Sequence, residues 1–443
     1  MKKKVFFTFL GDLIALYFGL FVTLILRYEG SFYEQFIGVH LVPFTIIFFL
    51  WIVIFYIAGL YDLRHLRNNL NFLKILGAAL GTNFVLAVLF FYVFSPFGIA
   101  PKTNLFLFLV VFSFVEFLWR RLSNGLISSG EPPNKILLVG EKDDVELIEK
   151  VNKENPIWLP QLGYRISSII GEKEIIADPT RINRIVAEKK INVVVIPRRL
   201  KNNPGLTKEL YNLLNAEVEI YDIPSFYQII ARKVPLSDLE ESWFLENLSA
   251  QQKFYDPLKR AWELVAALLL GIVLLPLELL VALMVKLTSR GPIIYTQTRI
   301  GEHGKEFVVY KFRTMKMHEN HSWPEKNDER ITTIGKFLRK THLDELPQLW
   351  NVVKGDVSVV GPRPDFVDFY KKLESEIPYY SIRTIIKPGL TGWAQVHKPI
   401  IASVDDTKER LEYDIYYIKN RSLILDLAIL LKTFKVLLMA GGL

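Results

Sequence analysis

Cysteine is absent from the 443-residue chain, and its absence excludes disulfides, thiolate metal sites and a cysteine nucleophile. The redox compartment stays undetermined. The chain also lacks internal repeats, low-complexity tracts and any nucleic-acid recognition motif or aromatic-studded basic groove, so no nucleic acid is expected as a partner. Any catalysis must therefore use groups other than thiolates.

Apolar residues are abundant instead, at 51% of the chain. This share is above that of an ordinary soluble globular protein, so the excess should lie in a membrane. The formal net charge of +8 would suit nucleic acid, an anionic lipid surface or a phosphate-bearing substrate equally well. The length is enough for roughly three domains.

The pattern of residues 1–125 predicts a membrane-spanning helical bundle. Its first apolar run is longer than a signal-peptide core and has no small-residue cleavage site, so it is expected to remain as an anchor. Further apolar runs follow, and the last of them is the shortest. The four predicted spans are Val5 to Leu26, Leu41 to Leu60, Ile75 to Phe94 and Leu105 to Trp119.

Basic residues are distributed unevenly among the loops of this bundle, which predicts that both of its ends are cytoplasmic. The cytoplasmic group comprises Lys2 to Lys4, Arg64, Arg67, Lys74, Arg120 and Arg121, and the other loops have only Arg27 and Lys102. Asp12 and Glu116 lie within or near the edges of spans. Either acid could line a polar pathway or make interhelical hydrogen bonds, and their single occurrence favours the hydrogen bonds.

Short apolar strands alternate with helix-like stretches over residues 130–235, which predicts an open, Rossmann-like α/β domain with a mostly parallel sheet. The strands are expected at residues 136–140, 165–170, 192–197 and 217–220. The first strand ends in VGEKDD rather than G-x-G-x-x-G, and its acids would repel a pyrophosphate. A structural or regulatory role is therefore favoured over nucleotide binding.

A fifth apolar segment, residues 261–287, is long enough to span a bilayer but contains Pro276 and has basic residues on both flanks. Because a crossing helix would leave one basic flank outside, the pattern favours a re-entrant helix that enters one leaflet, breaks at Pro276 and returns. A fifth full span is the alternative. The apolar stretch Leu423 to Met439 contains three charged residues and suits a helix in the membrane interface.

Residues 290–400 concentrate glycine turns and short, separated basic motifs. Their separation argues against one polybasic lipid patch and suits a small substrate with several phosphates. Among them lies THLDELPQLW, in which Pro347 fits a first helical turn, so Asp344 and Glu345 would stand just before a helix that Gly355 ends. The pair either caps this helix or supplies a nucleophile and a ligand to a hard cation.

The same half of the chain resembles a known family. The motifs KRAWE, GPIIYTQTRIG, YKFRTM, FLRKTHLDELPQLWNVVKGDVSVVGPRP, PGLTGWAQV and YDIYYIKN occur in order between about residues 253 and 443. They are similar to those of the bacterial sugar transferases, which are monotopic polyprenyl-phosphate phosphoglycosyl transferases. The four predicted spans and the α/β domain resemble the large, four-span subgroup of that family.

This resemblance implies an α-rich catalytic domain at residues 250–443, on the cytoplasmic face of a bacterial inner membrane. It implies transfer of a sugar 1-phosphate from a UDP-sugar to undecaprenyl phosphate, the first membrane step of a polysaccharide or glycoconjugate. Asp344 is similar to the family's nucleophile, Glu345 to its partner on Mg²⁺ and Arg339 to a phosphate-binding arginine. Lys311, Arg313 and Arg363 are further candidates to bind phosphate.

Three positions depart from the family pattern: Glu263 stands for a common Asp, Leu275 for a common Ser, and His397-Lys398 for a common Asn-Gly. The last pair lies in a loop that could contact the sugar or nucleotide. His303, His318 and His321 lack companions at ligand spacing and are expected to be solvated loop residues.

Two other functions stay open. A glycosyl transferase that attacks the sugar carbon would release UDP instead of UMP, and a membrane scaffold would use the acidic pair only as a cap. No motif distinguishes glucose, galactose or amino-sugar donors. The bundle and the α/β domain offer surface for a homodimer.

Overall fold

A computed structural model describes residues 2–61, 70–93, 102–129, 134–154, 159, 162–214, 216, 218–248, 252–288, 290–315, 330–398 and 403–439. Their contacts divide the chain into two compact units, Met1–Phe226 and Tyr227–Leu443. The first unit contains a helical bundle and an α/β domain, and each part is described by itself below.

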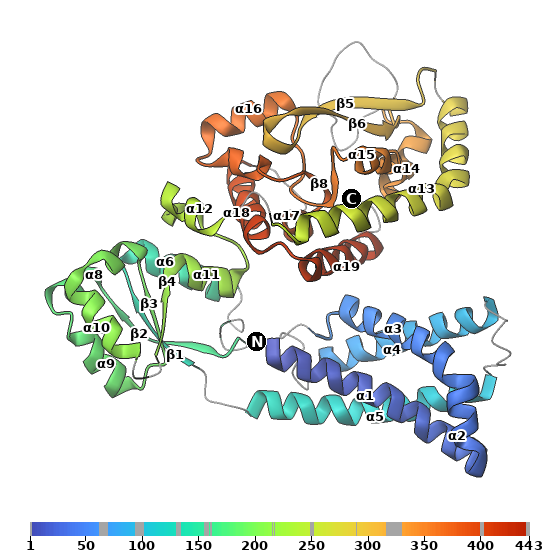
Figure 1. The fold of residues 1–443 in the computed structure, drawn as a ribbon, viewed down its shortest axis with the longest axis horizontal. Coiled ribbons are helices and arrows are strands. Elements are labelled where there is room, and N and C mark those ends of the chain that lie inside the picture. The colour runs from blue at the N-terminus through green and yellow to red at the C-terminus, as the bar shows by residue number, and fades with distance from the viewer. Residues whose placement is uncertain are drawn as a thin grey trace. The chain divides into compact units, whose positions relative to one another are not determined.

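Long helices form the bundle (Figure 1). Its main elements are α1 (Lys2–Tyr28), α3 (Leu41–Ala58), α4 (Leu70–Val93) and α5 (Lys102–Ser129), with the short helices η1 (Glu29–Ser31), α2 (Phe32–Gln35) and η2 (Phe36–His40) between α1 and α3. Among the described residues, three helical stretches are long and apolar enough to cross a membrane, Phe6–Ala58, Phe72–Phe91 and Tyr255–Thr288. The helix predicted at Leu105 to Trp119 is present within α5, which is outside these three stretches.

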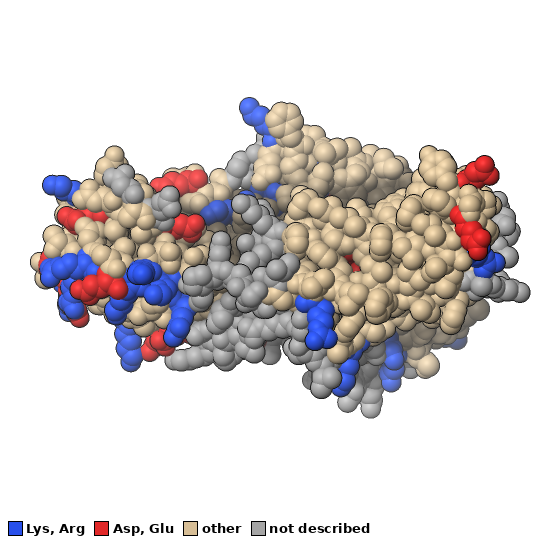
Figure 2. All heavy atoms as spheres, turned by 90° about the horizontal axis from the view of Figure 1, so that it is seen from below, with Lys and Arg blue, Asp and Glu red and all other residues tan. Residues whose placement is uncertain are grey.

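Aromatic side chains fill the interior of the bundle. Phe48 and Trp51 of α3 are buried against Phe108 and Phe112 of α5, and the rings of Trp51 and Phe112 are 5.4 Å apart between centroids. The outer surface is apolar as well, with Phe49 70% exposed, and Figure 2 shows few charged side chains over the bundle compared with the α/β domain. A surface of this kind suits contact with lipid.

A buried ionic cluster joins α1 to α5. The Arg120 guanidinium bonds Asp12 at 2.5 Å, Glu116 at 2.9 Å and the Leu60 carbonyl at 2.9 Å, and all three charged side chains are fully buried. Asp12 therefore makes the interhelical contact that its single occurrence favoured, whereas Glu116 pairs with Arg120 within its own helix α5. Burial of three charges together is tolerated only because each has a partner.

The α/β domain has a four-stranded, wholly parallel sheet in the order β2-β1-β3-β4, as the alternating pattern predicted. The strands are β1 (Asn134–Val139), β2 (Tyr164–Ile170), β3 (Val193–Ile196) and β4 (Glu219–Asp222). The helices are α6 (Lys142–Glu154), α8 (Glu172–Ala177), α9 (Arg181–Lys189), α10 (Pro204–Leu214) and α11 (Ile223–Ala231). Every side chain of β3 is buried, as expected for a central strand covered on both faces.

The carboxyl edge of this sheet, where open α/β folds commonly bind ligands, carries internal ion pairs. Arg199, after β3, contacts Asp144 at 2.7 Å and Glu172 at 2.8 Å. Lys201 contacts Asp222 at the end of β4 at 2.9 Å. Basic side chains of the domain therefore pair with Asp144, Glu172 and Asp222 at this edge.

The second unit is rich in helix, and its described residues form two small sheets. Its elements are α12 (Glu241–Asn247), α13 (Tyr255–Thr288), β5 (Ile294–Ile300), β6 (Glu306–Phe312), α14 (Thr333–Thr341), η8 (Leu343–Glu345), α15 (Gln348–Lys354), β7 (Ser358–Val360), α16 (Val367–Glu376), η9 (Tyr380–Thr384), β8 (Gly389–Thr391), α17 (Trp393–His397), α18 (Val404–Asn420) and α19 (Leu423–Met439). Strands β5 and β6 pair antiparallel, and β7 and β8 pair parallel.

Helix α13 is continuous through Pro276, and Figure 1 shows that it bends sharply along its length. The sequence predicted a break at Pro276, whereas the structure has a bend, since loss of one backbone hydrogen bond can kink a helix without ending it. Both halves of α13 pack on the same domain: Glu263 bonds Ser358 in β7 at 2.6 Å, and Val281 packs with Phe312 and Leu338.

The middle of α13 is the part that the domain leaves uncovered. Ile272 and Val273 are 70% and 71% exposed, and Leu279 and Leu280 beyond Pro276 are exposed as well. The bent helix therefore presents an apolar surface between its two packed ends.

Candidate active site

Asp344 and Glu345 lie in η8, the single turn between α14 and α15. His342 before them adopts a left-handed conformation (φ 56°), which turns the chain out of α14. Leu343 and Leu346, on either side of the pair, pack on the cluster of Val281, Phe312 and Leu338. The apolar residues of THLDELPQLW thereby fix the acidic pair against the second half of α13.

Helix α15 has the predicted limits, with Pro347 immediately before it and Gly355 (φ 88°) after it. Arg260 of α13 donates to the Val353 carbonyl at 2.8 Å. This bond supplies a donor to one of the last carbonyls of α15, which have no donor within the helix. Asn351 is fully buried and ties α15 to β6, because its amide donates to the Val308 carbonyl at 2.6 Å and accepts from the Tyr310 N–H at 3.2 Å.

The two adjacent carboxyls have opposite electrostatic surroundings. Burial and the neighbouring Glu345 charge raise the pKa of Asp344 above its ordinary value, although Lys311 and Arg339 partly oppose this. Burial would also raise the pKa of Glu345, but Lys311 and Arg363 reverse the effect and hold that pKa below its ordinary value. Lys311 Nζ lies 2.5 Å from Glu345 Oε1, and Arg363 Nη2 lies 4.0 Å from it. Such a divergence between neighbouring acids is typical of groups with different chemical roles.

Asp344 itself is 9% exposed. Within the described part of the chain, no side chain donates a hydrogen bond to its carboxylate. The carboxylate is therefore shielded from most water and accepts no hydrogen bond from a described side chain. This environment suits a nucleophile.

The other sequence-predicted cations occupy different environments. Arg339 Nε donates to Thr314 Oγ1 at 2.9 Å. Arg313 is 5% exposed and donates to the backbone carbonyls of Pro292 and Val285, the latter at 3.4 Å. Arg313 thus fixes the loop after α13, whereas Lys311 and Arg363 contact the acidic pair directly.

A small, solvent-open hollow lies beside Glu345, and we call it the Glu345 hollow. Its lining residues come from β5, β6, η8, α15, the loop after β7 and β8: Arg299, Val309, Lys311, Glu345, Gln348, Arg363, Pro364, Gly389 and Leu390. The sequence did not predict Arg299 or Gln348 here. A signal for Gln348 existed, since it lies four residues after Asp344 and three after Glu345, the spacing of one helix face.

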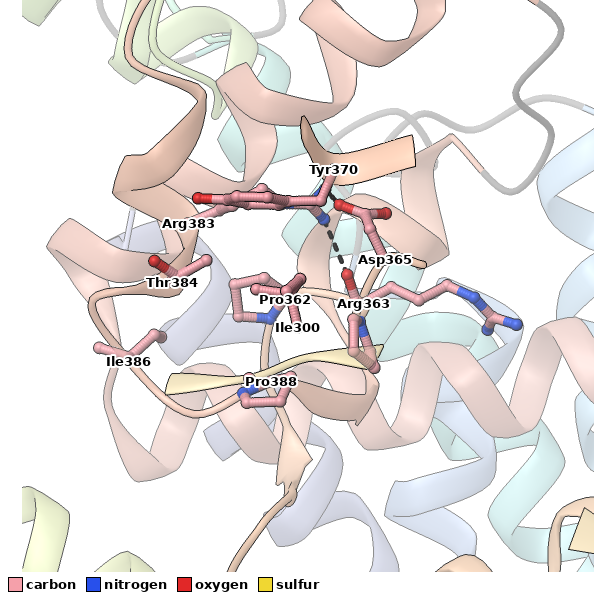
Figure 3. A pocket seen from close by; sticks show the side chains of 11 residues that line it. Ile300, Pro362, Arg363, Asp365, Tyr370, Arg383, Thr384, Ile386 and Pro388 are labelled. Carbon is pink, nitrogen blue, oxygen red and sulfur yellow. Dashed lines mark hydrogen bonds and ion pairs between the residues drawn. The ribbon is translucent and has the colours of Figure 1, made fainter. Parts of the chain in front are cut away.

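A second hollow of about 230 Å³ lies behind the Arg363 backbone. Arg383 is buried there and donates to the Arg363 carbonyl at 2.9 Å, while also bonding Asp365. Figure 3 shows the Arg363 side chain directed away from this second hollow, with only its backbone turned toward Arg383. Arg383 therefore orients the loop so that the Arg363 side chain can reach Glu345.

Two of the departures from the family pattern, Glu263 and His397, occupy packed positions, whereas Leu275 is 50% exposed. Glu263 accepts from Ser358 Oγ at 2.6 Å and from the Val359 N–H at 2.9 Å. His397 contacts the Trp393 carbonyl at 2.8 Å and Lys432 at 2.9 Å, so its ring packs between α17 and α19. These contacts give Glu263 and His397 structural roles.

No group of three or more His, Cys, Asp or Glu side chains at metal-binding distances occurs among the described residues. His303 lies in the turn between β5 and β6, and His318 and His321 lie outside the described residues. Any cation at the acidic pair would need substrate oxygens as additional ligands, which is how Mg²⁺ commonly binds in phosphate-transfer sites.

The apolar helices and the acidic pair among cations together define a membrane-bound enzyme of the class that transfers phosphate-bearing groups. Residues 254–440 match the family described as bacterial sugar transferase. A UDP-glucose:undecaprenyl-phosphate glucose-1-phosphate transferase of Klebsiella pneumoniae is 30% identical over 375 residues, 79% of this chain and 78% of that protein. The chain therefore belongs to the bacterial sugar transferase family.

Other relatives carry names with different sugars. A UDP-N-acetylgalactosamine-undecaprenyl-phosphate N-acetylgalactosaminephosphotransferase of Aeromonas hydrophila is 38% identical over 51% of this chain and 54% of that protein. An undecaprenyl-phosphate galactose phosphotransferase of Salmonella typhimurium is 41% identical over 42% of this chain and 41% of that protein. The relatives thus share the lipid phosphate in their names and differ in the sugar.

Proposed function

We propose that this protein transfers a sugar 1-phosphate from a UDP-sugar to undecaprenyl phosphate, releasing UMP, through a covalent intermediate on Asp344. The supporting observation is the acidic pair: Asp344 is buried, with no side-chain donor among the described residues, beside a Glu345 carboxylate paired with Lys311 and Arg363. The names of the relatives support the same substrates.

The proposed reaction has two displacements at one phosphorus. A carboxylate oxygen of Asp344 attacks the β-phosphorus, the bond from that phosphorus to the bridging oxygen breaks, and UMP leaves with the electron pair. An oxygen of the lipid phosphate then attacks the same phosphorus, and the bond to Asp344 breaks to regenerate the carboxylate. Because both steps bring anions together, Lys311, Arg339 and Arg363 are proposed to offset their repulsion.

Mg²⁺ is the proposed cofactor, and the residues present fit it. Glu345 has one oxygen paired with Lys311, which leaves the second oxygen to bind a cation together with Asp344 and substrate phosphates. When bound, the ion would supply positive charge at the diphosphate.

The bend in α13 supports a re-entrant membrane arrangement. Both ends of the helix pack on one domain while its apolar middle is exposed, so the middle is proposed to enter one leaflet of the bacterial inner membrane from the cytoplasmic side. Helix α19 is proposed to lie in the interface, with Ile424 83% exposed. This placement would put Asp344 near the level of the lipid phosphate.

The decisive experiment identifies the nucleotide released when the purified protein is mixed with undecaprenyl phosphate, Mg²⁺ and a panel of UDP-sugars. UMP from one donor, lost in Asp344→Asn and retained in the exposed control Asp368→Asn, would support the proposal and identify the sugar. Release of UDP would indicate attack at the sugar carbon. Normal turnover by Asp344→Asn would exclude Asp344 as the nucleophile, and absence of any nucleotide would favour a scaffold.

A further inference from the structure

The Glu345 hollow contains N–H donors that the protein itself does not satisfy. Gln348 and Arg299 are each 8% exposed, and both side chains line the hollow. Within the described part of the chain, Gln348 Nε2 and Arg299 Nε have no hydrogen-bond partner. Buried donors without acceptors are unfavourable, so their presence beside the acidic pair indicates that a ligand supplies the acceptors.

The charges of the hollow indicate which ligand this is. Arg299, Lys311 and Arg363 bring three positive charges, and Glu345 is the only carboxylate among the described residues of the lining. Burial and the nearby Arg363 lower the pKa of Arg299 to about 10, as expected where positive charge is undercompensated. A ligand that accepts hydrogen bonds and carries negative charge would satisfy both the donors and the cations.

Two contacts hold the Arg299 guanidinium in place, and neither of them uses Nε. Its Nη1 donates to the Pro364 carbonyl at 2.6 Å, and its guanidinium lies 4.2 Å from the centroid of the Phe366 ring. Gln348, one helical turn after the acidic pair, opens α15. The two donors therefore come from separate, well-packed elements, which favours a preformed site.

We propose that Gln348 Nε2 and Arg299 Nε donate hydrogen bonds to the oxygens of a phosphate monoester bound in the Glu345 hollow. This inference rests on the proposed function and specifies its phosphate-binding residues. The phosphate belongs either to the departing nucleotide or to the polyprenyl acceptor, since both expose the same terminal oxygens.

Gln348→Met tests this directly, because it removes the N–H donors while nearly conserving side-chain volume. The matched control is Gln228→Met, since Gln228 is also 8% exposed but belongs to α11. Equilibrium binding of UMP and of farnesyl phosphate is measured calorimetrically on the full-length protein in detergent, together with the melting temperature of each variant without ligand.

We expect Gln348→Met to weaken binding of one of the two phosphates about tenfold, or about 1.4 kcal/mol, while Gln228→Met binds as the wild type does. Loss of UMP affinity would assign the hollow to the nucleotide, and loss of farnesyl phosphate affinity would assign it to the acceptor. Unchanged affinity for both, or a lower melting temperature as the sole effect, would overturn the proposal. Because binding is measured without turnover, this result is separate from whether the wild type releases UMP.

Discussion

The pKa values of the neighbouring carboxyls are shifted in opposite directions, because burial dominates at Asp344 and the cations Lys311 and Arg363 outweigh it at Glu345. Lys311 lowers the pKa of both groups. If Asp344 is the nucleophile, activity requires its ionised form, so kcat/KM should fall at acidic pH with a midpoint above that of an ordinary aspartate. Lys311→Met should move this midpoint to still higher pH. A pH–rate profile measures it, and Lys354→Met, which removes a partly exposed lysine from the end of α15, should leave the midpoint unchanged.

The same burial predicts an effect of Asp344→Asn on stability. A raised carboxyl pKa means that folding disfavours the ionised form, so the wild type is less stable at neutral pH than it would be with a neutral group. Asp344→Asn should therefore raise the melting temperature at pH 7, and its advantage should shrink as pH falls through the native pKa of Asp344. Thermal unfolding in detergent across this pH range measures the difference. A variant that is less stable than the wild type at pH 7 would contradict the expectation.

At the scale of elements, Arg120 has the clearest structural role. It neutralises Asp12 and Glu116 between α1 and α5, where all three side chains are fully buried. Arg120→Met should destabilise the bundle by about 3–5 kcal/mol, because it leaves two buried acids without their cation. The exposed neighbour Arg121 provides the control, since Arg121→Met should change the midpoint of detergent-induced unfolding only slightly. Equal effects of the two variants would refute this role.

The bend of α13 can be tested by labelling, since the chain has no native cysteine. Lys253→Cys and Arg290→Cys place single thiols just outside the two ends of the helix. If the helix is re-entrant, a membrane-impermeant maleimide should modify both thiols in inverted vesicles, whose outer face is the cytoplasmic face. It should modify neither thiol in vesicles of the native orientation. A helix that crosses would give opposite results for the two positions.

The sequence was informative where a local pattern determines the structure. The alternation of apolar strands and helices predicted the parallel sheet, and Pro347 and Gly355 predicted the limits of α15. It was less informative where distant segments meet. The Glu345 hollow combines Arg299, Lys311 and Arg363 from three separate stretches. Their spacing in the sequence does not predict that these side chains line one hollow. The helix at Pro276 stayed continuous because packing at both of its ends stabilises the bent conformation.

At the scale of the whole molecule, the proposed chemistry belongs to one compact unit. Asp344, the cations around it and the bent helix α13 all lie within Tyr227–Leu443, and the family match falls within the same range. All described residues that line the Glu345 hollow lie between Arg299 and Leu390. A homodimer formed through the bundle and the α/β domain stays a prediction, which light scattering of the purified protein would test.

A protein truncated to residues 227–443 should therefore fold, remain bound to membranes and release UMP with the same UDP-sugar as the full chain. Its anchoring would depend on the exposed apolar middle of α13. We expect kcat within about tenfold of the full-length value, since no group proposed to contact the reacting phosphates is removed. The measurement is nucleotide release by the truncated and full-length proteins in matched vesicles, with Asp344→Asn in both backgrounds. A truncated protein that folds and binds membranes but releases no UMP would show that the first 226 residues take part in the reaction.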